Sequence, residues 1–498
     1  MIGGPNGRHR ALELGDTRPV SLAGPRAAQS PAHLHPSPPK LFGCLKTGDA
    51  ISPVRVSPIL AAVHIGIEPL EAACNDRIYT PLVTLWVFLG RVLNADQSCR
   101  AAVARLIADR ASRGLEPCSS ETGAYCQARR RLPERFFSAV ARLVGRDLGT
   151  QIDRRWLWKG CRVCLFDGST ASLPDTPEDR REYPLACNQV PGTNFAIARI
   201  GAIISLSCGA ILDLGICRYA GQGQGEVSLL RRLWDTLRPG DVLLGDRLIS
   251  GWVGMHRLKQ RGVDTVSRLS AHRRADFRKG TRLGKDDHLV VWSKPTSIRS
   301  VDRQTYKSLP DSITVREVRS RVERPGFRTR SIVVVTTLLG PAQASREELA
   351  RLYRARWNNE LDLRSIKVTL QMDMLRCKTP ELVRKEIWAH VLAYDLIRTV
   401  MARAAAREGV PPRSISFQAT LQVLEAFRPL IDHWAHRGEA RRAALYQQVL
   451  RAIAVHRVAD RPDRFEPRMA KRRPKRYDRL TRPRREIKLQ MIKRVAKI

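Results

Sequence analysis

The sequence contains no run of about 20 apolar residues, the length that a transmembrane helix requires. Its two most apolar stretches, 81–90 and 200–216, are too short or are interrupted by polar residues. It also lacks a regular cysteine pattern, because its 11 cysteines are scattered, and its first 40 residues contain no apolar segment typical of a signal peptide. These absences exclude a membrane-spanning protein and a disulfide-rich secreted domain, and they predict a chain that works in a reducing compartment.

Acidic residues are also scarce. The 498 residues include 48 Asp and Glu against 87 Lys and Arg, a formal net charge of +39. The last 48 residues, 451–498, hold 18 of the basic residues and 5 acids, so the rest of the chain is strongly basic too. A hydrophobic fraction of 43% is ordinary for a globular protein. We therefore expect a folded protein whose partner is a polyanion, with nucleic acid as the leading candidate.

One pair of cysteines, Cys161 and Cys164, has the Cys-x-x-Cys spacing found in zinc sites. No second pair and no histidine cluster lies nearby to complete a tetrahedral site. The pair also borders the apolar run 163–166. We therefore expect these thiols to fill a core rather than to bind zinc.

The composition and periodicity of the chain change several times along its length. We predict five regions: a disordered segment at 1–50, a helical domain at 51–155, an α/β domain at 156–405, a helical region at 406–460 and a basic tail at 461–498. Within the helical domain, Ser119 or Ser120 is expected to cap a helix that carries Arg129, Arg130 and Arg131. This basic helix could read DNA, or it could present a solvated arginine face.

The central region alternates short apolar runs with amphipathic ones. Strands are predicted at 162–167, 198–207, 210–218, 241–246 and 263–269, with helices at 225–237 and 251–261. This order indicates a mixed sheet covered by helices. Residues 270–335 break the alternation and read as a β-rich insertion, with apparently isolated strands at 288–292 and 313–318.

Two acids, Asp167 and Asp246, each follow an apolar strand and adjoin a glycine that could leave room for a substrate backbone. Acids at the carboxyl ends of strands point into the crevice where open α/β sheets bind ligands. Asp-Gly pairs also form ordinary turns, so each acid alone is weak evidence.

A helix predicted over 345–374 carries a sharper pattern. Tyr353, Arg356, Glu360 and Lys367 fall within one 60° stripe at 100° per residue, and Arg364 lies at its edge. Such a stripe could be a solvated row of i,i+4 ion pairs. That reading leaves Tyr353 and the neighbouring Trp357 unexplained.

These residues resemble the DDE transposases of the insertion-sequence-4 family. The family signature is Tyr, two residues, Arg, three residues, Glu, six residues, Lys, and Tyr353, Arg356, Glu360 and Lys367 match it fully. The sequences LFDGST around Asp167 and LLGDR around Asp246 match the two preceding motifs in the right order. The resemblance extends from about residue 79 to the C-terminal tail.

The resemblance implies a ribonuclease-H-like catalytic core with the β-rich insertion between its second and third acids. Asp167, Asp246 and Glu360 would hold two divalent cations, Mg²⁺ or alternatively Mn²⁺, which suit carboxylate oxygens. One ion would activate the attacking oxygen and the other would stabilise the leaving oxygen. The family's chemistry implies cleavage at transposon ends through a DNA hairpin, followed by joining to target DNA.

The resemblance also implies DNA contacts. Tyr353, Arg356 and Lys367 would bind phosphates, with Arg364 beside them, while Trp357 would either stack on a flipped base or pack in the core. The implied partner is double-stranded DNA, bound by a homodimer in the bacterial cytoplasm, with the helical region 418–455 as the expected dimer contact. Two alternatives stay open: a related nuclease that does not join strands, and an inactive DNA-binding descendant.

Overall fold

The computed structural model of the chain describes residues 78–185, 192–298, 301–321, 331–434, 438–458, 478 and 480–495. The predictions of disorder at 1–50 and of helical structure at 51–77 lie outside the described residues, as does most of the tail. The chain divides into units 1–37 and 38–498, and every described residue belongs to the second. Among the described helices, none is both long and apolar enough to span a bilayer.

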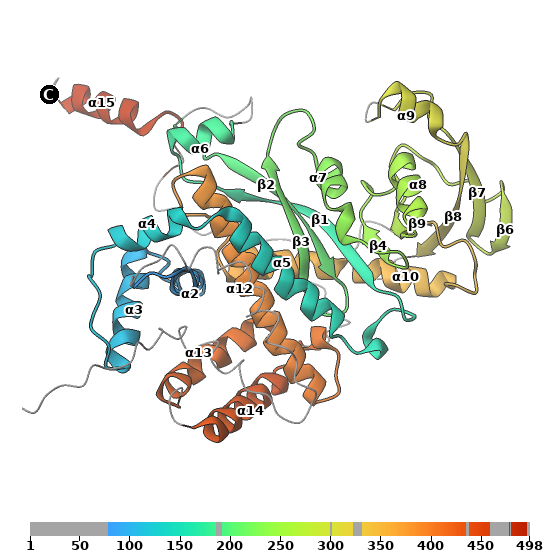
Figure 1. Ribbon diagram of the computed structural model, residues 1–498. Coiled ribbons are helices and arrows are strands. Elements are labelled where there is room, and N and C mark those ends of the chain that lie inside the picture. Colours follow the sequence, from blue (N-terminus) through green and yellow to red (C-terminus); the bar gives the residue numbers. More distant parts are fainter. Residues whose placement is uncertain are drawn as a thin grey trace, which may run out of the picture. The chain divides into compact units, whose positions relative to one another are not determined.

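A mixed sheet forms the centre of the described structure (Figure 1). Strands β1 to β3 form an antiparallel meander, while β4 and β5 run parallel to β1. The strand order β3-β2-β1-β4-β5 is the ribonuclease-H-like arrangement that we expected, and the α/β prediction is confirmed. The strands of this part are β1 (Val163–Ser172), β2 (Ile197–Ser205), β3 (Ile211–Arg218), β4 (Val242–Gly245) and β5 (Asp264–Arg268).

The β-rich insertion continues the same sheet. Its strands are β6 (Thr281–Gly284), β7 (Asp287–Ser293), β8 (Ser312–Arg321) and β9 (Ser331–Thr336), and β9 pairs antiparallel with β5. The prediction of isolated strands was therefore wrong, because β7 and β8 pair with each other along seven residues. The insertion has a core of its own around the buried Trp292, which also includes residues of α8 (Trp252–Gln260).

Helices cover the sheet and share its hydrophobic core. The 28-residue helix α12 (Pro380–Arg407) is buried along most of its length and contacts α5 (Glu134–Thr150) over a long interface. The same core joins the sheet to helices before and after it: α2 (Pro81–Val92), α13 (Phe417–Trp434) and α14 (Glu439–Val455). Cys164 is buried in the core beneath the opposite face, while Cys161 is half-buried, and neither forms a disulfide. The core-filling prediction for Cys164 is therefore confirmed.

The remaining helices complete the described chain. They are α3 (Cys99–Ser112), α4 (Gly123–Arg131), α6 (Pro177–Glu182), α7 (Glu226–Arg232), α9 (Arg303–Ser308), α10 (Arg346–Ala355), α11 (Trp357–Arg364) and α15 (Arg484–Val495). Helix α15 lies inside the predicted basic tail. Helix α5 begins after Pro133, as predicted, because proline suits a helix start.

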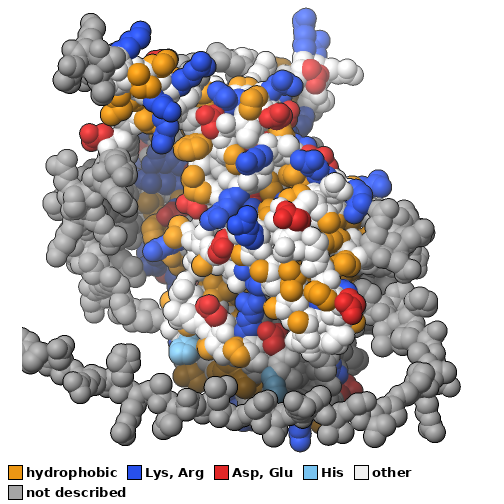
Figure 2. All heavy atoms as spheres, turned by 90° about the vertical axis from the view of Figure 1, so that its left-hand side faces the viewer, with side chains coloured by type: hydrophobic (Ala, Val, Ile, Leu, Met, Phe, Trp, Pro, Cys, Tyr) orange, Lys and Arg blue, Asp and Glu red, His pale blue; other side chains and the backbone are white. Residues whose placement is uncertain are grey.

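The basic helix α4 differs from its prediction in two ways. Thr122, rather than Ser119 or Ser120, occupies the N-cap, and its side chain makes no capping hydrogen bond. Arg129 is buried, with its guanidinium 4.6 Å from the centre of the Tyr125 ring. Only Arg130 and Arg131 of the three arginines are exposed. Figure 2 shows the side of the molecule on which α3 and α4 lie, where Lys and Arg are interspersed with acidic and apolar side chains.

The helix predicted over 345–374 is broken into three pieces. Ser345 and Glu348 form a capping box that starts α10, in agreement with the acidic first turn predicted there. Arg356 then separates α10 from α11, and a π-helix at Ser365–Thr369 follows. Each break rotates the following residues about the axis, so the single stripe of signature residues is not preserved along its whole length.

Candidate active site

The register between β1 and β4 brings two of the predicted acids together. Leu165 pairs with Leu244 in parallel, so Asp167 and Asp246 stand two residues beyond equivalent positions. Neighbouring strands lie about 4.8 Å apart, which places the two acids side by side. β4 ends at Gly245, whereas β1 continues to Ser172 and remains paired with β2. The prediction that β1 ends at Asp167 was therefore wrong. Asp167 nevertheless lies level with the end of the neighbouring strand β4.

Asp167 lies in an environment that disfavours its charge. Burial raises its pKa to about 6, and the negative charges of Asp246 and Glu226 add to this effect. The Gly168 N–H donates a 2.9 Å hydrogen bond to its carboxylate, and Arg356 lies nearby. Both of these interactions favour the ionised form but do not outweigh burial. A carboxylate held in this way gains strongly from a bound cation.

Arg356 connects the third acid to the first. Its guanidinium donates to the Glu360 carboxylate at 3.0 Å and lies 3.8 Å from the Asp167 carboxylate. The Tyr353 side chain lies beside the same guanidinium. Burial raises the pKa of Tyr353, so its hydroxyl stays neutral. Three of the four signature residues are thus in contact around one positive charge.

The residue types fit divalent cations, since Asp167, Asp246 and Glu360 offer only carboxylate oxygens. Within the described residues, however, no three Asp, Glu, His or Cys side chains lie close enough to hold one ion. The Arg356 guanidinium instead supplies positive charge between Asp167 and Glu360.

The space beside Gly168 and Gly245, the glycines next to the two aspartates, is occupied differently from the prediction. A Cβ on Gly168 would lie 2.4 Å from Cδ of Glu226, and one on Gly245 would lie 1.8 Å from Cδ1 of Ile249. Side chains of the protein itself fill both spaces. The expectation that these glycines make room for a substrate backbone was wrong, because neighbouring helical and loop residues occupy that room.

The remaining predicted residues spread along α11 and the π-helix. Trp357 is 52% exposed, which rules out the alternative that it packs in the core. Leu361 and Val368 are also exposed, at 41% and 60%. Lys367 is half-buried in the π-helix, and burial lowers its pKa. Lys367 therefore lies in a separate element, the π-helix after α11, whereas Tyr353 and Glu360 both lie beside Arg356.

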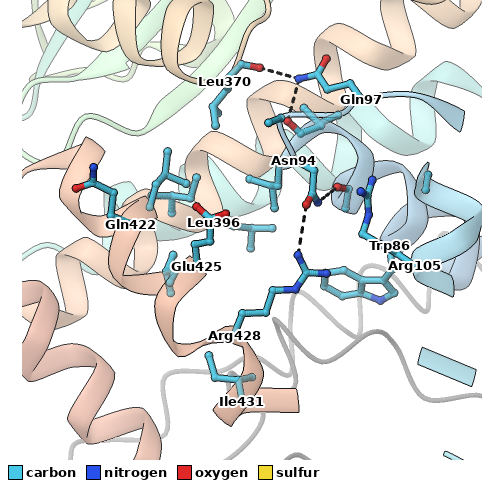
Figure 3. A pocket seen from close by; sticks show the side chains of 18 of the residues that line it. Trp86, Asn94, Gln97, Arg105, Leu370, Leu396, Gln422, Glu425, Arg428 and Ile431 are labelled. Atoms are coloured by element: carbon cyan, nitrogen blue, oxygen red, sulfur yellow. Dashed lines mark hydrogen bonds between the residues drawn. The ribbon is translucent and has the colours of Figure 1, made fainter. Parts of the chain in front are cut away.

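Arg364 lines a cavity of about 800 Å³ between the N-terminal helices and α12, α13 and α14. Figure 3 shows this cavity, with Arg105 and Arg428 near Trp86 and with Leu396 and Ile431 among its apolar residues. None of the three predicted catalytic acids lines it. The cavity is therefore separate from the predicted active site, and Arg364 is not grouped with the acids.

The sequence analysis missed two arginines near the acids. Arg247 directly follows Asp246, and Arg268 ends β5. Burial lowers the pKa of Arg268, and the nearby charges of Arg247 and Arg356 lower it further. The signal that could have found Arg268 is its place at a strand end, which is the same signal that identified the acids. These arginines add positive charge beside Tyr353 and the two aspartates.

Comparison with known proteins shows which family the chain resembles. The family profile described as "Transposase DDE domain" matches residues 158–396, which include all three acids and the whole insertion. The chain is also 25% identical over 449 residues to the transposase InsG for insertion sequence element IS4 of Escherichia coli, covering 86% of this chain and 92% of InsG. The matched domain and the similarity to InsG over most of the chain support a DDE transposase of the insertion-sequence-4 family.

Two further likenesses are local or remote. A putative transposase InsL for insertion sequence element IS186A of E. coli is 38% identical over 82 residues, 16% of this chain and 21% of InsL. A cryo-EM structure of the piggyBac transposase synaptic complex with hairpin DNA aligns over 83% of this chain and 85% of that one, at 8% identity and a TM-score of 0.39.

Membership of the family defines the reaction class. The protein is an enzyme that cleaves and transfers DNA strands, it depends on divalent metal ions, and its partner is DNA. The net charge of +39 agrees with this partner, since a basic protein gains affinity for a phosphate backbone by releasing its counterions.

Proposed function

We propose that this transposase binds the terminal inverted repeats of its own insertion sequence, cleaves both ends and joins them to target DNA. Asp167, Asp246 and Glu360 are the proposed catalytic acids. The observation that carries this assignment is the β1–β4 register, which sets Asp167 beside Asp246 at the end of β4, with Arg356 linking Asp167 to Glu360. Mg²⁺ is the proposed cofactor, bound as two ions that supply Lewis-acid charge to the attacking and leaving oxygens.

The signature side chains are proposed to hold the scissile strand. Arg356 offers a planar pair of donors that match a phosphate, and it is the group that must leave Glu360 when cations bind. Tyr353 would then follow Arg356 to the phosphate as a neutral hydroxyl donor. Lys367 would bind a more distant phosphate as a point charge. Arg364 is proposed to contact DNA from its position in the cavity wall, apart from the acids.

The proposed route passes through a DNA hairpin. A freed 3′ hydroxyl attacks the opposite strand, which requires the terminal bases to unstack. Trp357 is suited to receive a flipped base, because its indole is 52% exposed and directly follows Arg356. A buried Trp292, 4% exposed and hydrogen-bonded through its indole N–H to Glu317, is unsuited to that task.

Assembly and location complete the proposal. Two transposon ends must be held together, so we expect a homodimer on DNA, with α13 and α14 as the expected contact. The basic residues after 460 are proposed to add affinity without sequence preference. The bacterial cytoplasm, where the element's DNA lies, is the proposed compartment.

The test uses the full chain, Mg²⁺ and a DNA end bearing the inverted repeats that flank its gene. Hairpin and joined products support the proposal. Nicks that are never joined favour a nuclease without strand transfer, and binding without cleavage favours an inactive DNA-binding descendant. Replacing Mg²⁺ with Mn²⁺ in parallel reactions shows whether the cofactor assignment holds.

A further inference from the structure

A fourth acid, Glu226, lies against the backbone beside Asp167. It is the first residue of α7, and its carboxyl group fills the space over Gly168. A Cβ on Gly168 would lie 2.4 Å from Cδ and 2.6 Å from Oε1 of Glu226, which is closer than real Cβ contacts permit. Gly168 does not adopt a left-handed backbone conformation. The close approach of Glu226 is therefore the physical reason that residue 168 has no side chain.

Glu226 reaches the site from the face of the sheet opposite to Glu360. Side chains alternate along β1, so Phe166 and Gly168 face one side while Leu165 and Asp167 face the other. Phe166 packs in the core that contains Leu229 of α7. The Asp167 side chain faces the other way, toward Arg356 at the start of α11. A ligand at the end of β4 would be flanked by α11 on one side and by α7 on the other.

The Glu226 side chain is held in place and remains accessible. Arg199 on β2 lies 3.3 Å from its Oε1 and also donates to the carbonyl of Tyr219 at 3.1 Å. The Glu226 side chain is 27% exposed, so one side of the carboxylate faces solvent. Its carboxyl group lies over Gly168, the residue that directly follows Asp167. A third acid beside Asp167 and Asp246 increases their mutual repulsion, which a bound cation would relieve.

We propose that Glu226 is a fourth carboxylate of the active site, which holds a divalent cation, directly or through its bound water, beside Asp167. This inference rests on the proposed assignment of Asp167. Two divalent ions carry four positive charges, and Asp167, Asp246 and Glu360 supply only three negative ones. Glu226 would supply the fourth through the carboxylate that Arg199 pairs with in the metal-free protein.

The competing explanation is purely structural: Glu226 would only tie α7 to β2 through Arg199. The two roles predict different behaviour for the two partners. If Glu226 is a tether, Glu226→Gln and Arg199→Gln break the same ion pair and have the same consequences. If Glu226 holds a cation, Glu226→Gln weakens cation binding and Arg199→Gln does not, because Arg199 competes with the cation for the carboxylate.

The experiment is a Mn²⁺ titration of the full chain without DNA, followed by electron paramagnetic resonance. We expect Glu226→Gln to weaken binding of one Mn²⁺ ion about tenfold or more, as for groups that support a metal, and Arg199→Gln to leave affinity unchanged or increase it. The control is Glu182→Gln, a paired surface glutamate 3.7 Å from Arg218, which should bind Mn²⁺ like the wild type. Thermal melting of each variant without metal verifies that it is folded.

Asp167→Asn separates failure of this inference from failure of the proposed function. Wild-type affinity in Glu226→Gln, together with loss of Mn²⁺ binding in Asp167→Asn, would overturn the role of Glu226 alone. Equal weakening by Glu226→Gln and Arg199→Gln would also overturn it in favour of the tether. Wild-type affinity in Asp167→Asn, or no Mn²⁺ binding by the wild type, would contradict the proposed active site and the inference with it.

Discussion

Asp362 and Glu360 are two acids on one helix that should respond oppositely to loss of charge. Asp362 is fully buried, and its carboxylate accepts hydrogen bonds from Arg398 and from Arg413, the latter at 2.8 Å. Glu360 is 42% exposed and pairs with Arg356, four residues earlier. We predict that Asp362→Asn destabilises the fold severely, whereas Glu360→Gln abolishes DNA cleavage with little effect on stability.

The magnitudes follow from burial. Removing one member of a buried ion pair costs about 3–5 kcal/mol, because the remaining charges stay buried without a counterion. Here two guanidiniums, 6% and 15% exposed, lose their shared partner. An exposed i,i+4 pair is worth only about 0.5 kcal/mol. Urea unfolding of both variants measures the difference, as a lower midpoint with an unchanged slope for Asp362→Asn.

Two results would refute this reasoning. A free energy of unfolding for Asp362→Asn within about 1 kcal/mol of the wild type would show that the buried arginines find other partners. A loss of stability in Glu360→Gln as large as that in Asp362→Asn would show that Glu360 is held for the fold rather than for its proposed chemistry.

Three further predictions concern single side chains. Asp167→Asn should stabilise the metal-free protein by about 1–3 kcal/mol at pH 7.5, because the buried carboxylate is ionised above its pKa of about 6. This gain in stability should disappear near pH 4, where Asp167 is protonated in the wild type. Urea unfolding at both pH values measures the difference. Arg129→Lys should lower stability by about 2 kcal/mol, since lysine cannot stack as a plane on Tyr125, while the exposed Arg130→Lys should melt like the wild type. Trp357→Ala should leave stability within about 0.5 kcal/mol but reduce hairpin formation, and unchanged hairpin yield on the element's own ends would contradict the stacking role.

The core strands and the two aspartates could be predicted because their signals are local. Short apolar runs bounded by glycine and proline define β1, β4 and β5, and an acid at the end of such a run shows on which edge it lies. The register between β1 and β4 follows once both runs are placed in one parallel sheet. These features need no knowledge of distant parts of the chain.

The helix carrying the signature could be predicted only in part. Its capping box and its acidic first turn are encoded within four residues. The break at Arg356 is not, because Arg356 has ordinary helical dihedral angles and is not a residue type that ends helices. A uniform 100° per residue therefore groups Arg364 with Glu360, whereas the structure places Arg364 in a cavity wall.

Long-range partners explain the other failures. Arg129 reads as one of three equivalent basic residues, yet only it reaches the rings of Phe88 and Tyr125. Gly168 reads as a turn or as space for a ligand, yet Glu226, 58 residues later, fills that space. In both cases the deciding contact joins segments whose proximity no local pattern encodes.

The central claim is that Asp167, Asp246 and Glu360 form the active site of this transposase. The most direct measurement is the cleavage of a labelled transposon end in Mg²⁺ by Asp167→Asn, Asp246→Asn and Glu360→Gln, with DNA binding measured in parallel. The control is Glu347→Gln, an acid on the neighbouring helix that is 64% exposed. We predict that all three variants bind the end but release no cleaved product, while the control cleaves like the wild type. Cleavage at the wild-type rate by any one of the three would contradict the account.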